Sequence, residues 1–183
     1  MAVRDNKIFI PDRTYFITFT ILDWKYVFIN DEYCGLVYKW FDYLKEKYNN
    51  KIYGYVIMPN HIHALIKITN ESAKLSTIVM NAKRFLTYEI IMLLERSQGD
   101  NLLNFFKINA RTKNRARHKV FKDRYDSLLI ESQEFFLQKL NYIHKNPCQE
   151  KWQLAKSPED YKYLSASNYS NCGGYYNVDI AEF

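Results

Sequence analysis

Residues 53–68 read YGYVIMPNHIHALIKI, and this stretch decides the fold. Two runs rich in β-branched and aromatic residues flank a break at residues 58–60, which predicts a β-hairpin whose second strand begins at His61. Successive side chains of a strand point to opposite faces, so we expect His61 and His63 on one face and Ile62 in the core. Two neutral imidazoles on a rigid strand can bind a divalent cation. The alternative is two unrelated polar residues on an exposed face.

A second polar pair lies far downstream, in residues 141–147, which read NYIHKNP. Ser132 can cap a helix whose apolar residues recur at helical spacing, and Pro147 marks its end. Tyr142 and Asn146 are four residues apart and off the apolar stripe, so they lie one turn apart on a polar face. The residue before a proline is biased away from helical angles, so we expect Asn146 where the helix ends.

Together these two motifs resemble those of the single-tyrosine HUH transposases, in the branch associated with repetitive extragenic palindromes. The matching runs are VIMPNHIH at residues 56–63 and YIH-x-NP at residues 142–147. Residues 111–122 and those after Tyr169 match no motif of the family. Weaker similarity, in the same order along the chain, lies at residues 14–20, around Lys83 and at residues 160–169.

The resemblance implies a metal-dependent enzyme that cleaves and rejoins single-stranded DNA near palindromic hairpins through a covalent 5′-phosphotyrosine. Tyr142 would be the nucleophile, with no nucleotide cofactor. His61, His63 and Asn146 would hold Mg²⁺ or Mn²⁺, which a mixed nitrogen and oxygen ligand set suits. Because a free phenol has a pKa of about 10, the ion or a proton acceptor such as His144 has to assist its ionisation. In related enzymes the histidines and the tyrosine can come from different subunits, which leaves a homodimer open.

Three alternatives remain at this stage. A relaxase or replication initiator would use the same chemistry, but the compact chain and the single Tyr motif disfavour it. A non-catalytic RNA-binding module with the same sheet would bind nucleic acid whether or not a chelator is present. An inactive descendant of a transposase would keep the motifs without turnover.

Composition limits the class of protein. The 183 residues predict a single domain over residues 1–183, with a core at about 12–147 and a polar, tyrosine-rich tail at 148–183. A net charge of +6 and an aromatic content of 17% favour a polyanionic partner with unpaired bases. Three cysteines, an odd number, favour a reducing compartment. The charged start and the lack of a long apolar run predict a cytoplasmic protein without a membrane segment.

The other apolar patterns complete the expected fold. They predict a strand at residues 14–22, helices at 31–48 and 75–97, and a short strand at 126–130. With the hairpin, the order is strand, helix, strand, strand, helix, strand. This order predicts an α+β fold, a ferredoxin-like or RRM-like sandwich whose antiparallel sheet has helices packed on one face.

Residues 101–122 contain a run of basic side chains and no acidic one. Such a segment is suited to contact the phosphates of DNA, and two further basic residues lie on the outer face of the helix before it. The candidate DNA-binding residues are therefore Lys83, Arg84, Arg111, Lys113, Arg115, Arg117 and Lys119.

Overall fold

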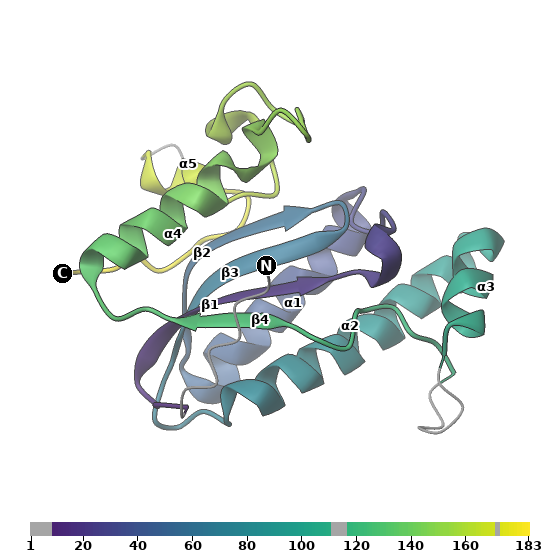
Figure 1. Cartoon of the computed structure of the whole chain (residues 1–183), viewed down its shortest axis with the longest axis horizontal. Helices are drawn as coiled ribbons and strands as arrows, with labels where there is room; N and C mark the ends of the chain where they lie inside the picture. Colours follow the sequence, from purple (N-terminus) through teal and green to yellow (C-terminus); the bar gives the residue numbers. More distant parts are fainter. Residues whose placement is uncertain (1–8, 111–116, 171–172) are drawn as a thin grey trace.

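The computed structural model describes residues 9–110, 117–170 and 173–183, so the predicted DNA-binding residues Arg111, Lys113 and Arg115 lie outside the described residues. One four-stranded antiparallel sheet, in the order β2-β3-β1-β4, forms the centre of the molecule (Figure 1). Its strands are β1 (Arg13–Thr20), β2 (Lys51–Met58), β3 (His61–Ile68) and β4 (Asp126–Leu129). The α-helices are α1 (Asp31–Tyr48), α2 (Leu75–Arg96), α3 (Asp100–Ile108), α4 (Gln133–Lys145) and α5 (Ala166–Tyr169).

The predicted hairpin is present. β2 pairs with β3 through a two-residue turn, so that Met58 lies opposite His61. β3 also pairs with β1, which makes β3 a central strand with a neighbour on each side. Ile62 is fully buried in the larger hydrophobic cluster, as the alternation predicted.

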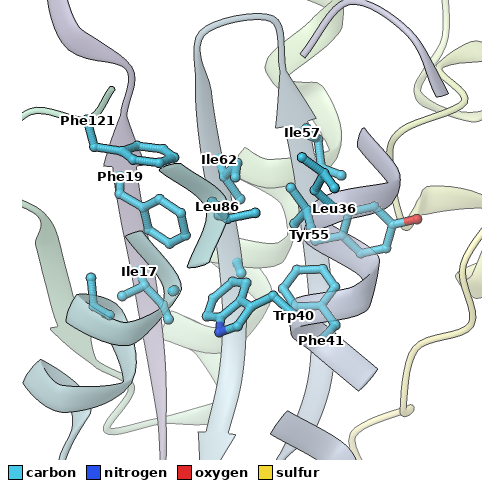
Figure 2. Packing of buried hydrophobic residues seen from close by; sticks show 14 of the residues in the cluster. Ile17, Phe19, Leu36, Trp40, Phe41, Tyr55, Ile57, Ile62, Leu86 and Phe121 are labelled. Atoms are coloured by element: carbon cyan, nitrogen blue, oxygen red, sulfur yellow. The ribbon is translucent and has the colours of Figure 1, made fainter. Parts of the chain in front are cut away.

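Helices α1 and α2 cover one face of the sheet and form that larger cluster with it (Figures 1 and 2). The Asn30 side chain accepts a hydrogen bond from the Tyr33 backbone N–H and so caps the start of α1. Trp40 and Phe41 of α1 pack beneath the strands, where Phe19 of β1 meets Trp40 edge to face. The predicted α+β sandwich is confirmed for this βαββαβ unit.

Helix α4 lies on the opposite face, an arrangement that the sequence pattern did not reveal (Figure 1). Its apolar stripe of Phe136, Leu140 and Ile143 packs with residues of β1, β2 and β3 in a second, smaller cluster. The predicted cap is present, because the Ser132 hydroxyl accepts a hydrogen bond from the Phe135 N–H. The sheet therefore has helices on both faces, and only α1 and α2 follow the one-sided packing expected.

The tail lies along the outer edge of β2. The Ile57 N–H donates to the Tyr163 carbonyl and the Ser165 N–H donates to the Tyr55 carbonyl, so the tail closes this edge of the sheet. It contains the short helices η4 (Pro158–Asp160) and α5, and otherwise little regular structure, as expected. Helix α3 was not predicted. Within the described ranges, no helix is long and apolar enough to cross a membrane.

Candidate active site

The two histidines of β3 share one face of the sheet and lie beneath α4. Their ring centroids are 4.7 Å apart, and each residue is only 5% exposed. Ile62 between them belongs to the cluster on the other face. The paired arrangement inferred from the sequence is present, and it is buried rather than exposed.

Each imidazole has a hydrogen-bond partner at Nδ1. His61 Nδ1 lies 2.7 Å from the Asn60 amide oxygen, which can only accept, so Nδ1 carries the proton and Nε2 keeps its lone pair. The Asn60 amide nitrogen donates to the Trp24 carbonyl, which fixes the amide orientation. His63 Nδ1 lies 2.6 Å from the Thr18 hydroxyl, which can accept in the same way.

Burial keeps both rings neutral. It lowers the pKa of His61 to about 4, with a further contribution from the positive charge of Lys151. The pKa of His63 is lowered well below its ordinary value by burial, then by His61, Lys151 and Lys139. At neutral pH both Nε2 atoms are therefore available as ligands.

Tyr142 projects from α4 toward this pair. Its ring centroid is 5.2 Å from that of His63 and 5.9 Å from that of Phe16, which itself stacks on His63. Tyr142 remains 41% exposed, so a substrate can reach the phenol. The histidines and the tyrosine, 79 residues apart between positions 63 and 142, come together within a single chain.

Asn146 follows α4 as the first residue of the turn η3 (Asn146–Cys148). It is 1% exposed and keeps helical angles, with φ −57° and ψ −49°, despite the proline that follows. Its amide oxygen and His63 Nε2 are both buried and find no hydrogen-bond partner in the described part of the chain. Such groups are destabilising unless a donor or cation meets them.

These atoms fit a divalent cation. Two imidazole nitrogens and one amide oxygen form a mixed donor set that suits Mg²⁺ or Mn²⁺. Among residues 9–110, 117–170 and 173–183, no three His, Cys, Asp or Glu side chains converge on a metal site. Asn146, whose buried amide oxygen has no partner in the described part of the chain, is the candidate for a third protein ligand.

A glycine sets how closely α4 approaches the sheet. A Cβ built on Gly54 of β2 would lie 2.7 Å from Cδ1 of Leu140, so a larger residue would force the Leu140 side chain, or α4 itself, to move. On the same side, His144 Nε2 lies 3.1 Å from the Ser165 hydroxyl of the tail, and its ring packs against Tyr169. His144 is therefore half-buried, covered by the tail.

Comparisons with known proteins support this fold. No protein-family model matches the sequence, and no curated protein matches it. A solved REP-associated tyrosine transposase bound to a REP hairpin superposes with a TM-score of 0.64, at 14% identity, over 99% of this chain and 94% of that chain. The chain has the fold of a REP-associated tyrosine transposase.

Two other solved structures are less similar to this chain. A candidate transposase from Deinococcus radiodurans R1 matches with a TM-score of 0.48 at 13% identity, over 77% of this chain and 95% of that chain. The tRNA(His) guanylyltransferase of Saccharomyces cerevisiae matches with a TM-score of 0.47 at 12% identity, over 78% and 62%. Neither similarity is strong enough to carry an argument about this chain.

Some predicted DNA-binding residues meet on this transposase fold. Lys83, Arg84 and Lys119 line one cavity of about 390 Å³ between α2 and residues 118–125. Lys83 donates to the backbone carbonyls of residues 122, 123 and 124, and burial lowers its pKa to about 8. Arg84 and Arg117 are exposed, and Lys119 pairs with Asp123 at 3.0 Å. Lys83 thus anchors a loop, while Arg84 and Arg117 are accessible.

Sequence reasoning missed the residues around His61 and His63. Thr18 lies directly opposite His63 in the β1–β3 register, which depends on long-range strand pairing. Asn60 is adjacent to His61 in the Pro-Asn-His run, and that adjacency is the one local signal available. Two tryptophan rings also approach His61, with centroids at 5.9 Å for Trp24 and 5.6 Å for Trp152.

Proposed function

We propose that this chain is a metal-dependent transposase that cleaves and rejoins single-stranded DNA near palindromic hairpins. The observation that supports the proposal most strongly is the Tyr142 phenol beside two buried, neutral imidazoles in one chain. If Tyr142 served packing alone, it would not need an ordered pair of neutral histidines beside it. The shared fold of a transposase bound to a REP hairpin is consistent with the proposal.

In this proposal His61, His63 and Asn146 hold Mg²⁺ or Mn²⁺. The bound ion would polarise the scissile phosphate and offset the charge that grows on its oxygens. Thr18 and Asn60 keep Nδ1 of each imidazole engaged, which would leave the lone pair of each Nε2 free to coordinate the ion.

Tyr142 attacks the phosphorus with its phenolic oxygen. The new O–P bond replaces the bond between phosphorus and the 3′ oxygen, which takes up a proton and leaves as a 3′-hydroxyl. The phenol loses its proton, and the phosphate stays on the 5′ end of the downstream strand, joined to Tyr142. One phosphodiester replaces another of similar energy, so a 3′-hydroxyl can reverse the step without a nucleotide cofactor.

The proposed substrate is a hairpin with a single-stranded flank. A phenol on a helix cannot readily reach an in-line position in stacked duplex, so the cleaved strand has to be unpaired. Arg84, Arg117 and Lys119 are proposed to contact the hairpin phosphates, together with the predicted Arg111, Lys113 and Arg115. Because the histidines and the tyrosine come from one chain, we propose that a monomer suffices for cleavage. We also propose that the enzyme acts in the cytoplasm.

A covalent-adduct experiment tests the proposal. A hairpin oligonucleotide labelled at its 3′ end is incubated with the protein and Mn²⁺, and the products are separated on a denaturing protein gel. Wild type is expected to give a labelled adduct that Tyr142→Phe, His61→Ala and a chelator each abolish. Tyr26→Phe, which changes another exposed tyrosine, is the matched control and should retain the adduct. An adduct that survives in Tyr142→Phe would contradict the nucleophile.

A non-catalytic RNA-binding module is the second candidate, because the ferredoxin-like sheet is common to both. RRM-type modules stack bases on an open sheet face. Here α4 and the second cluster cover that face. Nucleic-acid binding that is unchanged by a chelator, with no covalent adduct formed, would favour this candidate.

A further inference from the structure

The segment after β1 is held against the tip of the β2–β3 hairpin. The Ile21 N–H donates to the Asn60 carbonyl at 2.9 Å, and the N–H groups of Val27 and Phe28 both donate to the Pro59 carbonyl. Between these anchors, Asp23 and Trp24 adopt left-handed angles, with φ 48° and 57°. Two consecutive non-glycine residues in that region persist only where the surroundings hold them there. The backbone therefore places Trp24 in a defined position.

The position of Trp24 is unusual for a large apolar side chain. Trp24 is 51% exposed, and neither hydrophobic cluster includes it. Trp152, the other tryptophan near His61, is half-buried and packs against the cluster beneath α4. Packing therefore explains Trp152, but it does not explain why an indole is presented to solvent at position 24.

The surroundings of Trp24 indicate its ligand. The ring centroid is 5.9 Å from that of His61, and the Lys122 ammonium lies 4.2 Å from the indole centroid. Asn60 links the two sites, because its amide donates to the Trp24 carbonyl and accepts from His61. Lys122 covers one face of the indole, and about half of the Trp24 surface stays exposed, so a nucleotide base can stack on the remaining face while its phosphate pairs with the ammonium.

We propose that Trp24 stacks on the unpaired base next to the scissile phosphate and that Lys122 contacts the phosphate of that nucleotide. The inference rests on the proposed function, since it takes the strand at His61 to be single-stranded DNA. It adds a base-binding site next to His61, built by the loop between β1 and α1. Stacking positions the strand and is tolerant of base identity.

A binding experiment with chemistry switched off tests this. The Tyr142→Phe protein is titrated into a fluorescently labelled hairpin with a single-stranded flank, and the dissociation constant is measured by anisotropy. Adding Trp24→Ala is expected to weaken binding about tenfold, as loss of one stacked base does. Trp24→Phe, which keeps a ring, should retain most of the affinity, and Trp24→Leu, which keeps apolar bulk, should lose most of it. Tyr26→Ala, which changes a neighbouring aromatic residue that is also more than half exposed, is the control and should bind as the parent does.

An abasic series locates the base. Each nucleotide of the flank is replaced in turn by an abasic site, and one position should weaken binding to the Tyr142→Phe protein about tenfold. In Tyr142→Phe with Trp24→Leu, that same replacement should have no further effect. Equal affinities for the Phe and Leu variants, or an abasic effect that persists in the Leu variant, would overturn the proposal.

The two proposals fail separately. If wild type gives no covalent adduct but the Trp24 and abasic effects coincide, the stacking site stands and the transposase function falls. If the adduct forms through Tyr142 and Trp24→Leu binds as well as Trp24→Phe, the stacking site falls and the function stands.

Discussion

The two faces of the sheet differ in what they bury. Beneath α1 and α2 the sheet packs an aliphatic and aromatic core, in which Phe19, Trp40 and Phe41 interlock (Figure 2). Beneath α4 the apolar cluster is smaller, and beside it lie His63 and Asn146, each with a buried atom that has no hydrogen-bond partner among the described residues. One face supplies stability, while the other gives up some of it by burying polar atoms without partners in the part of the chain that the structure describes.

Adjacent residues of β3 show the division at its smallest scale. Ile62 points into the core and His63 into the site, and each is at most 5% exposed. The alternation of a strand thus assigns neighbouring residues to different tasks. Substitutions on the two faces should therefore separate chemistry from stability.

The largest expected effect is on the α4 face. His63→Ala should abolish the covalent adduct and Mn²⁺ binding, because it removes one of three proposed ligands. The substitution His63→Ala should lower the free energy of unfolding less than a substitution in the apolar core does. His63 Nε2 has no hydrogen-bond partner to lose in the described part of the chain. Adduct formation and calorimetric Mn²⁺ titration measure the first effect, and denaturant unfolding measures the second. Retained Mn²⁺ affinity would contradict the ligand role.

The reverse pattern is expected one residue away. Ile62→Ala should lower the free energy of unfolding by about 2–5 kcal/mol, because it leaves a cavity in a tightly packed core. Below the unfolding transition, adduct formation should stay close to that of wild type. Urea unfolding and the adduct assay at low temperature check the two halves. Loss of chemistry in a folded Ile62→Ala protein would break the separation of the faces.

Acid should weaken the face beneath α4. Burial lowers the pKa of His144 to about 4, partly offset by Glu159, whereas an unfolded histidine titrates near its ordinary value of 6.5. Between pH 6.5 and pH 4 the unfolded chain binds a proton at His144, whereas the folded chain keeps this residue neutral. The free energy of unfolding is therefore unaffected by His144 above pH 6.5 and decreases as the pH falls toward 4. The loss from His144 should be about 1.4 kcal/mol per pH unit.

Unfolding free energies measured from pH 7 to pH 4 test this. His61, also with a pKa of about 4, should contribute in the same direction. His144→Gln cannot titrate, so its stability should fall less steeply with acid than that of wild type. Parallel curves for the two proteins would contradict a neutral, buried His144.

The smallest expected change concerns the spacing of α4. Gly54→Ala places a Cβ against Leu140 and should cost about 1 kcal/mol of stability. Because α4 carries Tyr142, a shift of the helix should slow adduct formation by about tenfold or more. Combining the change with Leu140→Val, which removes a methylene, should restore part of the rate. A Gly54→Ala protein with the wild-type rate would show that α4 need not pack so closely.

Local patterns predicted much of this molecule. The hairpin, the bounds of α1 and the cap of α4 at Ser132 follow from short-range signals. The His pair follows from alternation within one strand. These features depend on neighbours in the sequence, so a single chain reveals them.

Other features depend on contacts between distant residues. Periodicity marks the apolar side of α4 but does not tell which face of the sheet it covers. Thr18 becomes the partner of His63 only through the β1–β3 register. The burial of His144 depends on Ser165 of the tail, 21 residues later in the chain. Trp24 depends on left-handed backbone angles that its residue type disfavours.

Asn60 joins two events that are usually considered separately. One amide group orients the imidazole of His61 and holds the carbonyl of Trp24. Metal capture and strand recognition should therefore be energetically coupled, so that occupancy of either site strengthens the other by the same factor. Replacing Asn60 would weaken that cooperativity, so that the proposed metal would bind no more readily with a strand in place than without one.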